Sequence, residues 1–88
     1  MELFEKQIIF SEHALERAIE RQFELREIRE SLRKGFIYAD PKKPKNGICI
    51  YKFGNQNYTI VFCEYEKVVV IITIYRSSQL EIRKIEGR

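Results

Sequence analysis

The stretch that decides the fold is SEHALERAIER, which runs from Ser11 to Arg21. It has the pattern of one amphipathic helix, with Ser11 as an N-cap whose hydroxyl can accept a backbone N–H of the first turn. At about 100° per residue, its apolar side chains form one arc, and we expect this arc to face a core. The residues of the arc are Ala14, Leu15, Ala18 and Ile19.

Three basic residues, His13, Arg17 and Arg21, lie along one edge of that arc. Their spacing of i, i+4 and i+8 places them in one row where the helix meets the surface on which it packs. An imidazole that titrates near neutral pH, beside two guanidiniums, is a candidate site for a phosphate group. The alternatives are an imidazole bonded to the backbone and arginines paired with glutamates along the helix.

Length and composition indicate a single domain over residues 1–88. A chain of this size can bury one hydrophobic core but not two. No apolar run is long enough to span a membrane, and the charged N-terminus does not resemble a secretory signal. We therefore expect a cytoplasmic protein without a membrane partner. Charged residues make up 33% of the chain, mostly Lys, Arg and Glu, which is typical of thermophile proteins.

The two cysteines, Cys49 and Cys63, lie in apolar, strand-like segments. Neither has the spacing of a metal ligand, and the chain has one histidine to join them. We expect two small buried side chains, with a cross-strand disulfide as the alternative. We expect no metal and no other cofactor.

The rest of the chain predicts a small sheet that carries the helix. A second helix is expected from Glu24 to Lys34, with Gly35 in a left-handed conformation directly after it. Strands are expected at residues 7–10, 36–39, 48–53, 56–64 and 67–75, with a tight turn at Gly54-Asn55. The sequence of residues 76–88 is compatible with a strand, with a helix and with a tail that docks on a partner. The fold class predicted is α+β, with two N-terminal helices on one face of a four- to five-stranded, mainly antiparallel sheet.

The residues available for chemistry suit one reaction, the cleavage of RNA without a metal. In that reaction the 2′-hydroxyl attacks the adjacent phosphate, and His13 is the natural base for its proton. Arg17 and Arg21 would stabilise the charge that grows on the phosphate. Three further candidates could assist the leaving oxygen, and the tyrosines among them could also stack on unpaired bases. These candidates are Tyr58, Tyr75 and Arg76, although tyrosines at alternating strand positions more often pack at the edge of a core.

The net charge of +3 is concentrated in one loop, where Lys42, Lys43 and Lys45 surround Pro44. Together with Arg76, these lysines are candidates for RNA binding through phosphate attraction. The alternative is a loop that is only solvated.

The string HALERAIER, residues 13–21, with the second helix and the Val-rich late strand, resembles a known pattern. It is similar to an uncharacterised family of bacterial and archaeal domains with an H-A-x-x-R-x-x-x-R helix, grouped with the RelE/BrnT-like toxins. The resemblance implies a compact RelE-like fold and a metal-independent endoribonuclease that acts as the toxin of a toxin–antitoxin pair. It carries over His13, Arg17 and Arg21 as the motif positions. One departure is Gln22, where the family usually has Gly.

The resemblance implies two partners, namely RNA, free or bound to a ribosome, and a cognate antitoxin protein. A homodimer stays open. Two alternatives to the nuclease also stay open, namely a nucleic-acid-binding module without catalysis and a protein-interaction domain on the same fold.

Overall fold

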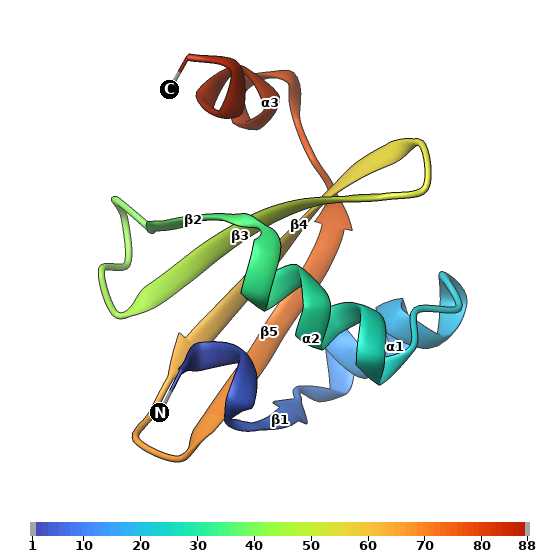
Figure 1. The fold of residues 1–88 in the computed structure, drawn as a ribbon, viewed down its shortest axis with the longest axis vertical. Coiled ribbons are helices and arrows are strands. Elements are labelled where there is room, and N and C mark those ends of the chain that lie inside the picture. Colours follow the sequence, from blue (N-terminus) through green and yellow to red (C-terminus); the bar gives the residue numbers. More distant parts are fainter. Residues whose placement is uncertain (1, 88) are drawn as a thin grey trace.

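The structure, a computed structural model, describes residues 2–87 and contains a five-stranded sheet with helices on both of its faces (Figure 1). The helical elements are η1 (Leu3–Glu5, a 3-10 turn), α1 (Glu12–Glu20), α2 (Leu25–Lys34) and α3 (Gln79–Glu86). The strands are β1 (Gln7–Phe10), β2 (Phe36–Ala39), β3 (Asn46–Phe53), β4 (Gln56–Glu64) and β5 (Val68–Arg76). The predicted α+β class is confirmed. Met1 and Arg88, which the predicted domain includes, lie outside the described residues.

The strands lie in the order β1-β5-β4-β3-β2. Strands β2 to β5 form an antiparallel meander, while β1 pairs in parallel with β5. The sheet is therefore mixed, and the Val- and Ile-rich β5 lies between two neighbours, as expected for a strand that is apolar on both faces. A bulge near Val61 and Phe62 shifts the register between β4 and β5.

Helices α1 and α2 pack on the same face of the sheet, α1 over β5 and α2 over β3. Ser11 holds α1 on the sheet, because its hydroxyl accepts the backbone N–H of Ala14 at 3.0 Å and donates to the carbonyl of Ile72 at 2.7 Å. The core between the helices and the sheet contains fully buried Ile28, Ile60 and other branched side chains. Burying one such side chain stabilises the fold by about 1.5–3 kcal/mol.

The expectation that Leu15 and Ile19 face the core is wrong. Their side chains are 48% and 67% exposed, whereas Ala14 and Ala18 are buried. Two alanines let the helix approach β5 closely, so the buried arc is narrow and centred on them. Leu15 and Ile19 each lie about 100° around the helix from an alanine, which turns them outwards.

The prediction that Gly35 takes a left-handed conformation is also wrong. Gly35 ends α2, but in an extended conformation with φ of −71°. A side chain is excluded there because a Cβ atom would lie 2.5 Å from the sulfur of Cys49 and 2.6 Å from the carbonyl oxygen of Ser31. Glycine is required at this position for the close contact between α2 and β3, not for a left-handed turn. Gly54, in contrast, has a φ of +63° in the predicted β3–β4 turn.

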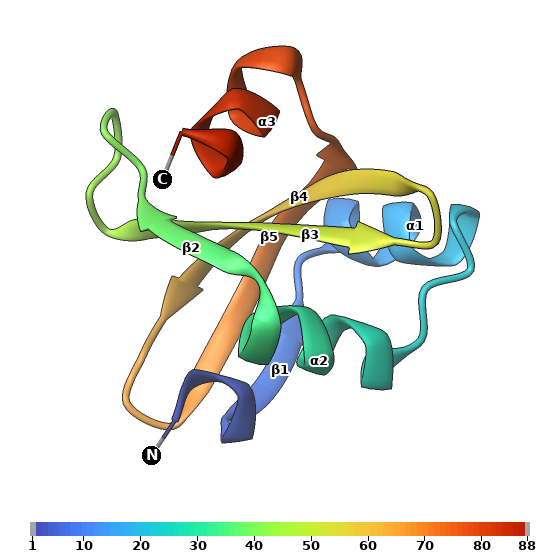
Figure 2. The same cartoon turned by 45° about the horizontal axis from the view of Figure 1, so that its top comes forward.

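The third helix, α3, lies within residues 76–88, for which the sequence pattern did not distinguish helix, strand and tail. It lies on the sheet face opposite α2, as Figure 2 shows. The amine of Lys84 lies 4.4 Å from the ring centre of Tyr38, and the hydroxyl of Tyr75 donates to Glu81 at 2.8 Å. Among residues 2–87, no helix has the length and apolar character needed to cross a bilayer.

The two cysteines are both free thiols. Cys49 is buried on the helix side of β3, where its thiol donates to the carbonyl of Ser31 at 3.1 Å. Cys63 lies on β4 opposite Asn46 of β3, three pairs from the position opposite Cys49, which Ile60 occupies. A side chain three positions from Ile60 points to the other face of the strand, so the alternative of a cross-strand disulfide is excluded.

Candidate functional site

The basic row of α1 is formed as its spacing predicts, but its members differ in their surroundings. His13 is exposed in the first turn, and its ring has no hydrogen-bond partner among residues 2–87. Arg17, whose side chain is 42% exposed, lies 3.4 Å from a carboxylate oxygen of Glu20. This exposed i, i+3 pair contributes little to stability. The guanidinium of Arg17 therefore remains available to a bound anion.

Arg21 reaches across to the sheet. Its Nη1 donates to the hydroxyl of Tyr58 at 3.4 Å, and its guanidinium carbon lies 5.4 Å from the centre of the Tyr58 ring. Tyr58 on β4 is 8% exposed, so its ring is anchored in the core and only its polar end reaches this rim. Because the ring is fixed, Arg21 has a fixed contact point.

The residue after Arg21 turns the chain. Gln22 has a φ of +60°, the left-handed conformation that favours glycine. This turn brings Phe23 back under the end of α1, where its N–H bonds to the carbonyl of Ala18 at 2.9 Å. A glycine would take this conformation without steric cost, whereas Gln22 takes it with its side chain.

Arg76 is the direct partner of Tyr58 across β4 and β5. Directly opposed residues have Cβ atoms about 4.5–5.5 Å apart and point to the same face, so Arg76 stands beside Tyr58 on the helix side. Its Nε donates to the side-chain oxygen of Gln56 at 2.9 Å. Arg21, Tyr58 and Arg76 are called the arginine–tyrosine cluster below.

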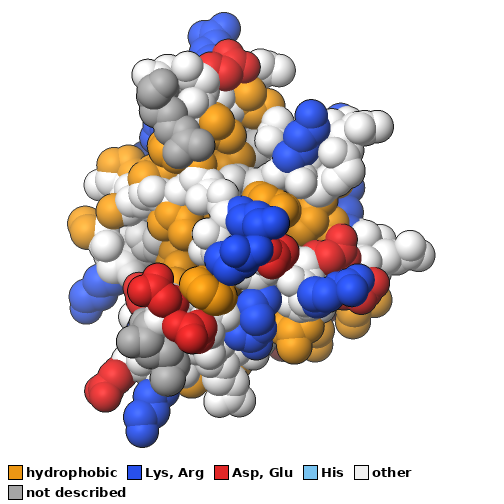
Figure 3. Space-filling view, in the orientation of Figure 1, with side chains coloured by type: hydrophobic (Ala, Val, Ile, Leu, Met, Phe, Trp, Pro, Cys, Tyr) orange, Lys and Arg blue, Asp and Glu red, His pale blue; other side chains and the backbone are white. Residues whose placement is uncertain are grey.

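Neither arginine of this cluster has a carboxylate partner among residues 2–87, because every ion pair found there joins other residues. Elsewhere, basic and acidic side chains alternate over the face that carries α2, as Figure 3 shows. Two arginines without carboxylate partners, next to one phenol in the sheet, are suited to a phosphate, which guanidiniums can bind through parallel charged hydrogen bonds.

Tyr75 is not brought to the cluster. It is opposite Thr59 and adjacent to Arg76, so it points to the face that carries α3. Its hydroxyl donates to Glu81, and burial, this bond and the negative charge of Glu81 together raise the pKa of Tyr75 above its ordinary value. The phenol is therefore a hydrogen-bond donor that fastens α3 to the sheet.

The lysine loop is not brought to the cluster either. Lys42, Lys43 and Lys45 are exposed between β2 and β3, where β3 begins beside Cys63 at the end of β4. Tyr58 lies near the other end of β4. A strand of this length spans about 20–30 Å at about 3.3 Å per residue, so the loop and the cluster occupy opposite ends of the sheet.

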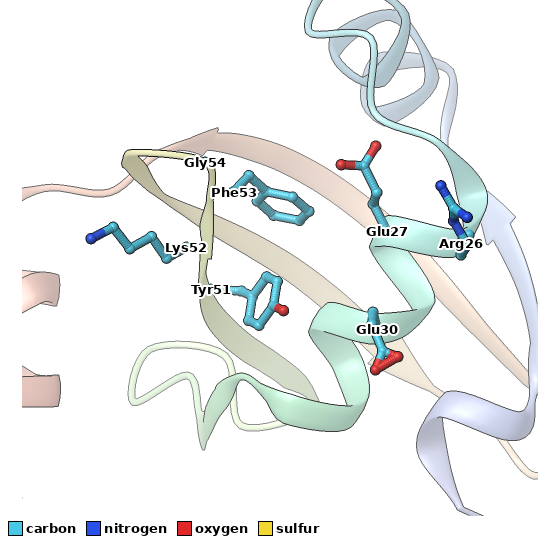
Figure 4. Close-up of a pocket in the computed structure, with 7 residues that line it drawn as sticks. All are labelled: Arg26, Glu27, Glu30, Tyr51, Lys52, Phe53 and Gly54. Atoms are coloured by element: carbon cyan, nitrogen blue, oxygen red, sulfur yellow. The ribbon is translucent and has the colours of Figure 1, made fainter.

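A groove beside the cluster is the feature that the residue pattern did not reveal. It has a volume of about 330 Å³ and lies between α2 and the β3–β4 hairpin (Figure 4). Phe53 in its wall stacks on Phe23 with ring centres 4.4 Å apart, and lies 5.9 Å from Tyr58. The available signal was the placement of Tyr51, Phe53 and Tyr58 around the Gly54 turn, which puts all three on one face.

The chain was also compared with known proteins. Within residues 2–87, no group of three or more His, Cys, Asp and Glu side chains could hold a metal ion. Neither the curated proteins nor the solved structures contain a significant match to the chain. One protein family does match, over residues 10–76, which include α1, the joint at Gln22, the whole β2–β5 meander and both arginines of the cluster. The chain therefore belongs to the family described as Domain of unknown function (DUF4258).

Proposed function

We propose that this protein is a metal-independent endoribonuclease whose phosphate site is the arginine–tyrosine cluster. The observation that carries the proposal is that Arg21 contacts the anchored phenol of Tyr58 and Arg76 is the cross-strand partner of Tyr58, without any described carboxylate to neutralise either arginine. An RNA phosphate would supply the missing negative charge.

In the proposed reaction the 2′-hydroxyl oxygen attacks phosphorus and the bond to the 5′-oxygen breaks. His13 accepts the 2′-proton. Because His13 lies eight residues from Arg21, about 12 Å along α1, we expect the reacting phosphate to lie against Arg17, between them, with Arg21 and Arg76 stabilising the negative charge from the cluster side. Arginine does not give up a proton in proteins, so the proton for the leaving 5′-oxygen comes from Tyr58. The products are a 2′,3′-cyclic phosphate and a 5′-hydroxyl, and solvent returns the proton from His13 to Tyr58.

The biological setting we propose is a toxin–antitoxin pair on a RelE-like fold, in the cytoplasm. The exposed apolar side chains Leu15 and Ile19 on α1 support a protein partner of this kind. The substrate is RNA, free or bound to a ribosome, and the lysine loop would attract its more distant phosphates.

A second candidate function is RNA binding without cleavage. It is favoured by one observation, namely that no described residue donates to or accepts from the His13 ring. A general base is usually held by such a bond, which sets its tautomer and orientation. In this alternative the cluster binds RNA in the same way, but His13 takes no part in a reaction and its removal leaves RNA binding unchanged.

The experiment compares wild type with His13→Ala, Arg21→Ala and Tyr58→Phe, using growth arrest on expression and cleavage of RNA by purified protein in EDTA. We expect His13→Ala to lower the rate by about 10²–10⁴ and Arg21→Ala by about 10²–10³, with thermal midpoints near that of wild type. Arg83→Ala on α3 is the matched control, because it removes an exposed arginine from the other face.

Three results decide the matter. Cleavage that leaves 2′,3′-cyclic ends and depends on His13 supports the nuclease. RNA binding that depends on Arg21, without any cleavage with or without ribosomes, selects the binding module. If wild type neither binds nor cuts RNA, both functions are rejected.

A further inference from the structure

We propose that the groove between α2 and the β3–β4 hairpin is the subsite for one unpaired nucleobase, and that Glu27 makes guanine the preferred base. The inference rests on the proposed RNA-binding function and adds a base preference to it. The groove is lined by Arg26, Glu27, Glu30, Tyr51, Lys52, Phe53 and Gly54. Its volume of about 330 Å³ is at the lower end of the range for small-ligand pockets.

Two aromatic rings supply the stacking surface. Figure 4 shows Tyr51 and Phe53 pointing from the hairpin towards α2, while Lys52 points away between them. Their ring centres are 5.2 Å apart with the ring planes at 82°, and both side chains are only partly buried. A base can therefore stack on one of the two rings while its edge meets the other. Stacking of a base on such a ring contributes about 1–3 kcal/mol and works for every base. The rings therefore account for binding but not for preference.

Glu27 supplies the preference. One of its carboxylate oxygens accepts the backbone N–H of Glu24 at 2.9 Å, and the second oxygen has no partner within residues 2–87. The other groove carboxylate, Glu30, is engaged by Arg33 and Lys34. Figure 4 shows Glu27 on the Phe53 side of the helix, whereas Glu30 turns to the other side. Glu27 is thus the carboxylate that a stacked base would meet.

Guanine fits a carboxylate better than the other bases do. Its Watson–Crick edge carries two adjacent donors, N1–H and the N2 amino group, which match an ionised carboxylate that only accepts. Adenine and cytosine place an acceptor next to their amino donor, and uracil places its N3–H between two carbonyls. Each of these acceptors would repel the carboxylate.

Contacts between aromatic rings connect the wall of the groove to the phosphate site. Phe53 contacts Phe23 and Tyr58, and the hydroxyl of Tyr58 accepts from Arg21. Tyr51 is also the direct partner of Tyr58 across β3 and β4. A nucleotide with its base on Tyr51 and Phe53 would therefore carry its phosphate towards Arg21 and Arg76.

The test measures anisotropy of labelled hexaribonucleotides that carry 2′-O-methyl groups, which prevent cleavage. The sequences are UUUUUU, UUAUUU, UUGUUU and the same hexamer with inosine, which lacks the N2 amino group, in place of guanosine. At fixed salt, wild type should bind UUGUUU about 10-fold more tightly than UUUUUU, which is about 1.4 kcal/mol, with inosine between them.

The informative variant is Glu27→Gln. Glutamine keeps the capping box of α2 with Glu24, so the fold should survive, but its amide offers one acceptor and a competing donor. The guanine preference should fall to within about twofold while binding of UUUUUU is unchanged. Glu66→Gln, an exposed residue in the β4–β5 turn, is the control and should keep the full preference. Phe53→Leu should weaken every hexamer by about 10-fold.

A titration of guanosine and uridine monophosphates, followed by amide chemical shifts, separates the two proposals. Hexamers that bind through Arg21 with equal affinity would overturn the base subsite alone. If no hexamer binds but guanosine monophosphate shifts the amides of residues 51–54, the subsite stands and the RNA function fails. If neither hexamers nor nucleotides bind, both proposals are overturned.

Discussion

Two residues in this protein take backbone conformations that their residue types do not suggest. Gln22 takes the left-handed conformation that glycine prefers, whereas Gly35 takes an ordinary extended one. The first is held because the turn places Phe23 under α1, and the second is required because the sulfur of Cys49 occupies the space of a side chain. Backbone preference and packing are thus separate reasons for the choice of a residue.

Cys49 should make the stability of the fold sensitive to alkaline pH. Burial raises the pKa of its thiol to about 12, whereas an unfolded chain loses this proton at about pH 8.5. The folded pKa is the higher one, so the stabilising contribution is complete below about pH 8.5 and disappears as the pH rises towards 12. The thermal midpoint of Cys49→Ala should therefore fall less steeply between pH 9 and 12 than that of wild type.

Ile60→Val is the control for this measurement, because it trims a fully buried side chain directly opposite Cys49 and removes no titrating group; its slope should equal that of wild type. Burial also raises the pKa values of Tyr38 and Tyr75, so some alkaline slope should remain in every variant. Equal slopes for Cys49→Ala and wild type would contradict the assignment.

At the scale of elements, α1 packs on the sheet with one side and presents basic side chains with another. Its alanine side is buried against β5, and its basic side leads to the cluster through Arg21. The close approach that the alanines allow is also what leaves Leu15 and Ile19 exposed. The same feature therefore positions the site and creates an apolar surface.

Two substitutions test this orientation of α1. Ala14→Asp should unfold the protein, because it would bury an unpaired charge at a position that is 0% exposed. Leu15→Asp should cost no more than about 1 kcal/mol, because that side chain is 48% exposed. Thermal unfolding followed by circular dichroism measures both. Equal losses of stability would show that the helix is rotated from the orientation described here.

At the scale of the whole molecule, positive charge is divided between two ends of one sheet. The cluster lies where β4 begins and β5 ends, and the lysine loop precedes β3 at the opposite end. Tyr58 and Cys63, which lie opposite positions near the two ends of β3, are five residues apart on β4, about 16 Å at about 3.3 Å per residue. The loop can therefore attract an RNA chain but cannot reach the phosphate that the cluster binds.

Replacing Lys42, Lys43 and Lys45 together with Gln should weaken RNA binding and leave the cleavage rate at saturating RNA unchanged. The slope of log affinity against log salt should flatten by about 0.7 for each RNA phosphate that the loop no longer neutralises. Binding and single-turnover cleavage across a salt series measure the two effects. An unchanged slope would make the loop a solvated connector, and a lower rate at saturation would place it nearer the chemistry.

Much of this architecture is local and could be predicted from the residues alone. The Ser11 cap, both N-terminal helices, the Gly54 turn and the alternation that buries Tyr58, Ile60 and Phe62 depend on interactions within a few residues. Such interactions have the same physical chemistry in the unfolded chain as in the folded one. They determined the α+β class and the basic row on α1.

Only the tertiary structure decided which residues meet. Whether Tyr75 or Arg76 stands beside Tyr58 depends on the register between β4 and β5, and a shift of one residue would exchange their faces. The packing of the Ala14 and Ala18 side of α1 against the sheet decided that Leu15 is exposed. The groove forms where the first half of α2 lies beside the β3–β4 hairpin. Each of these is set by packing between segments distant in the chain, which a pattern within one segment does not contain.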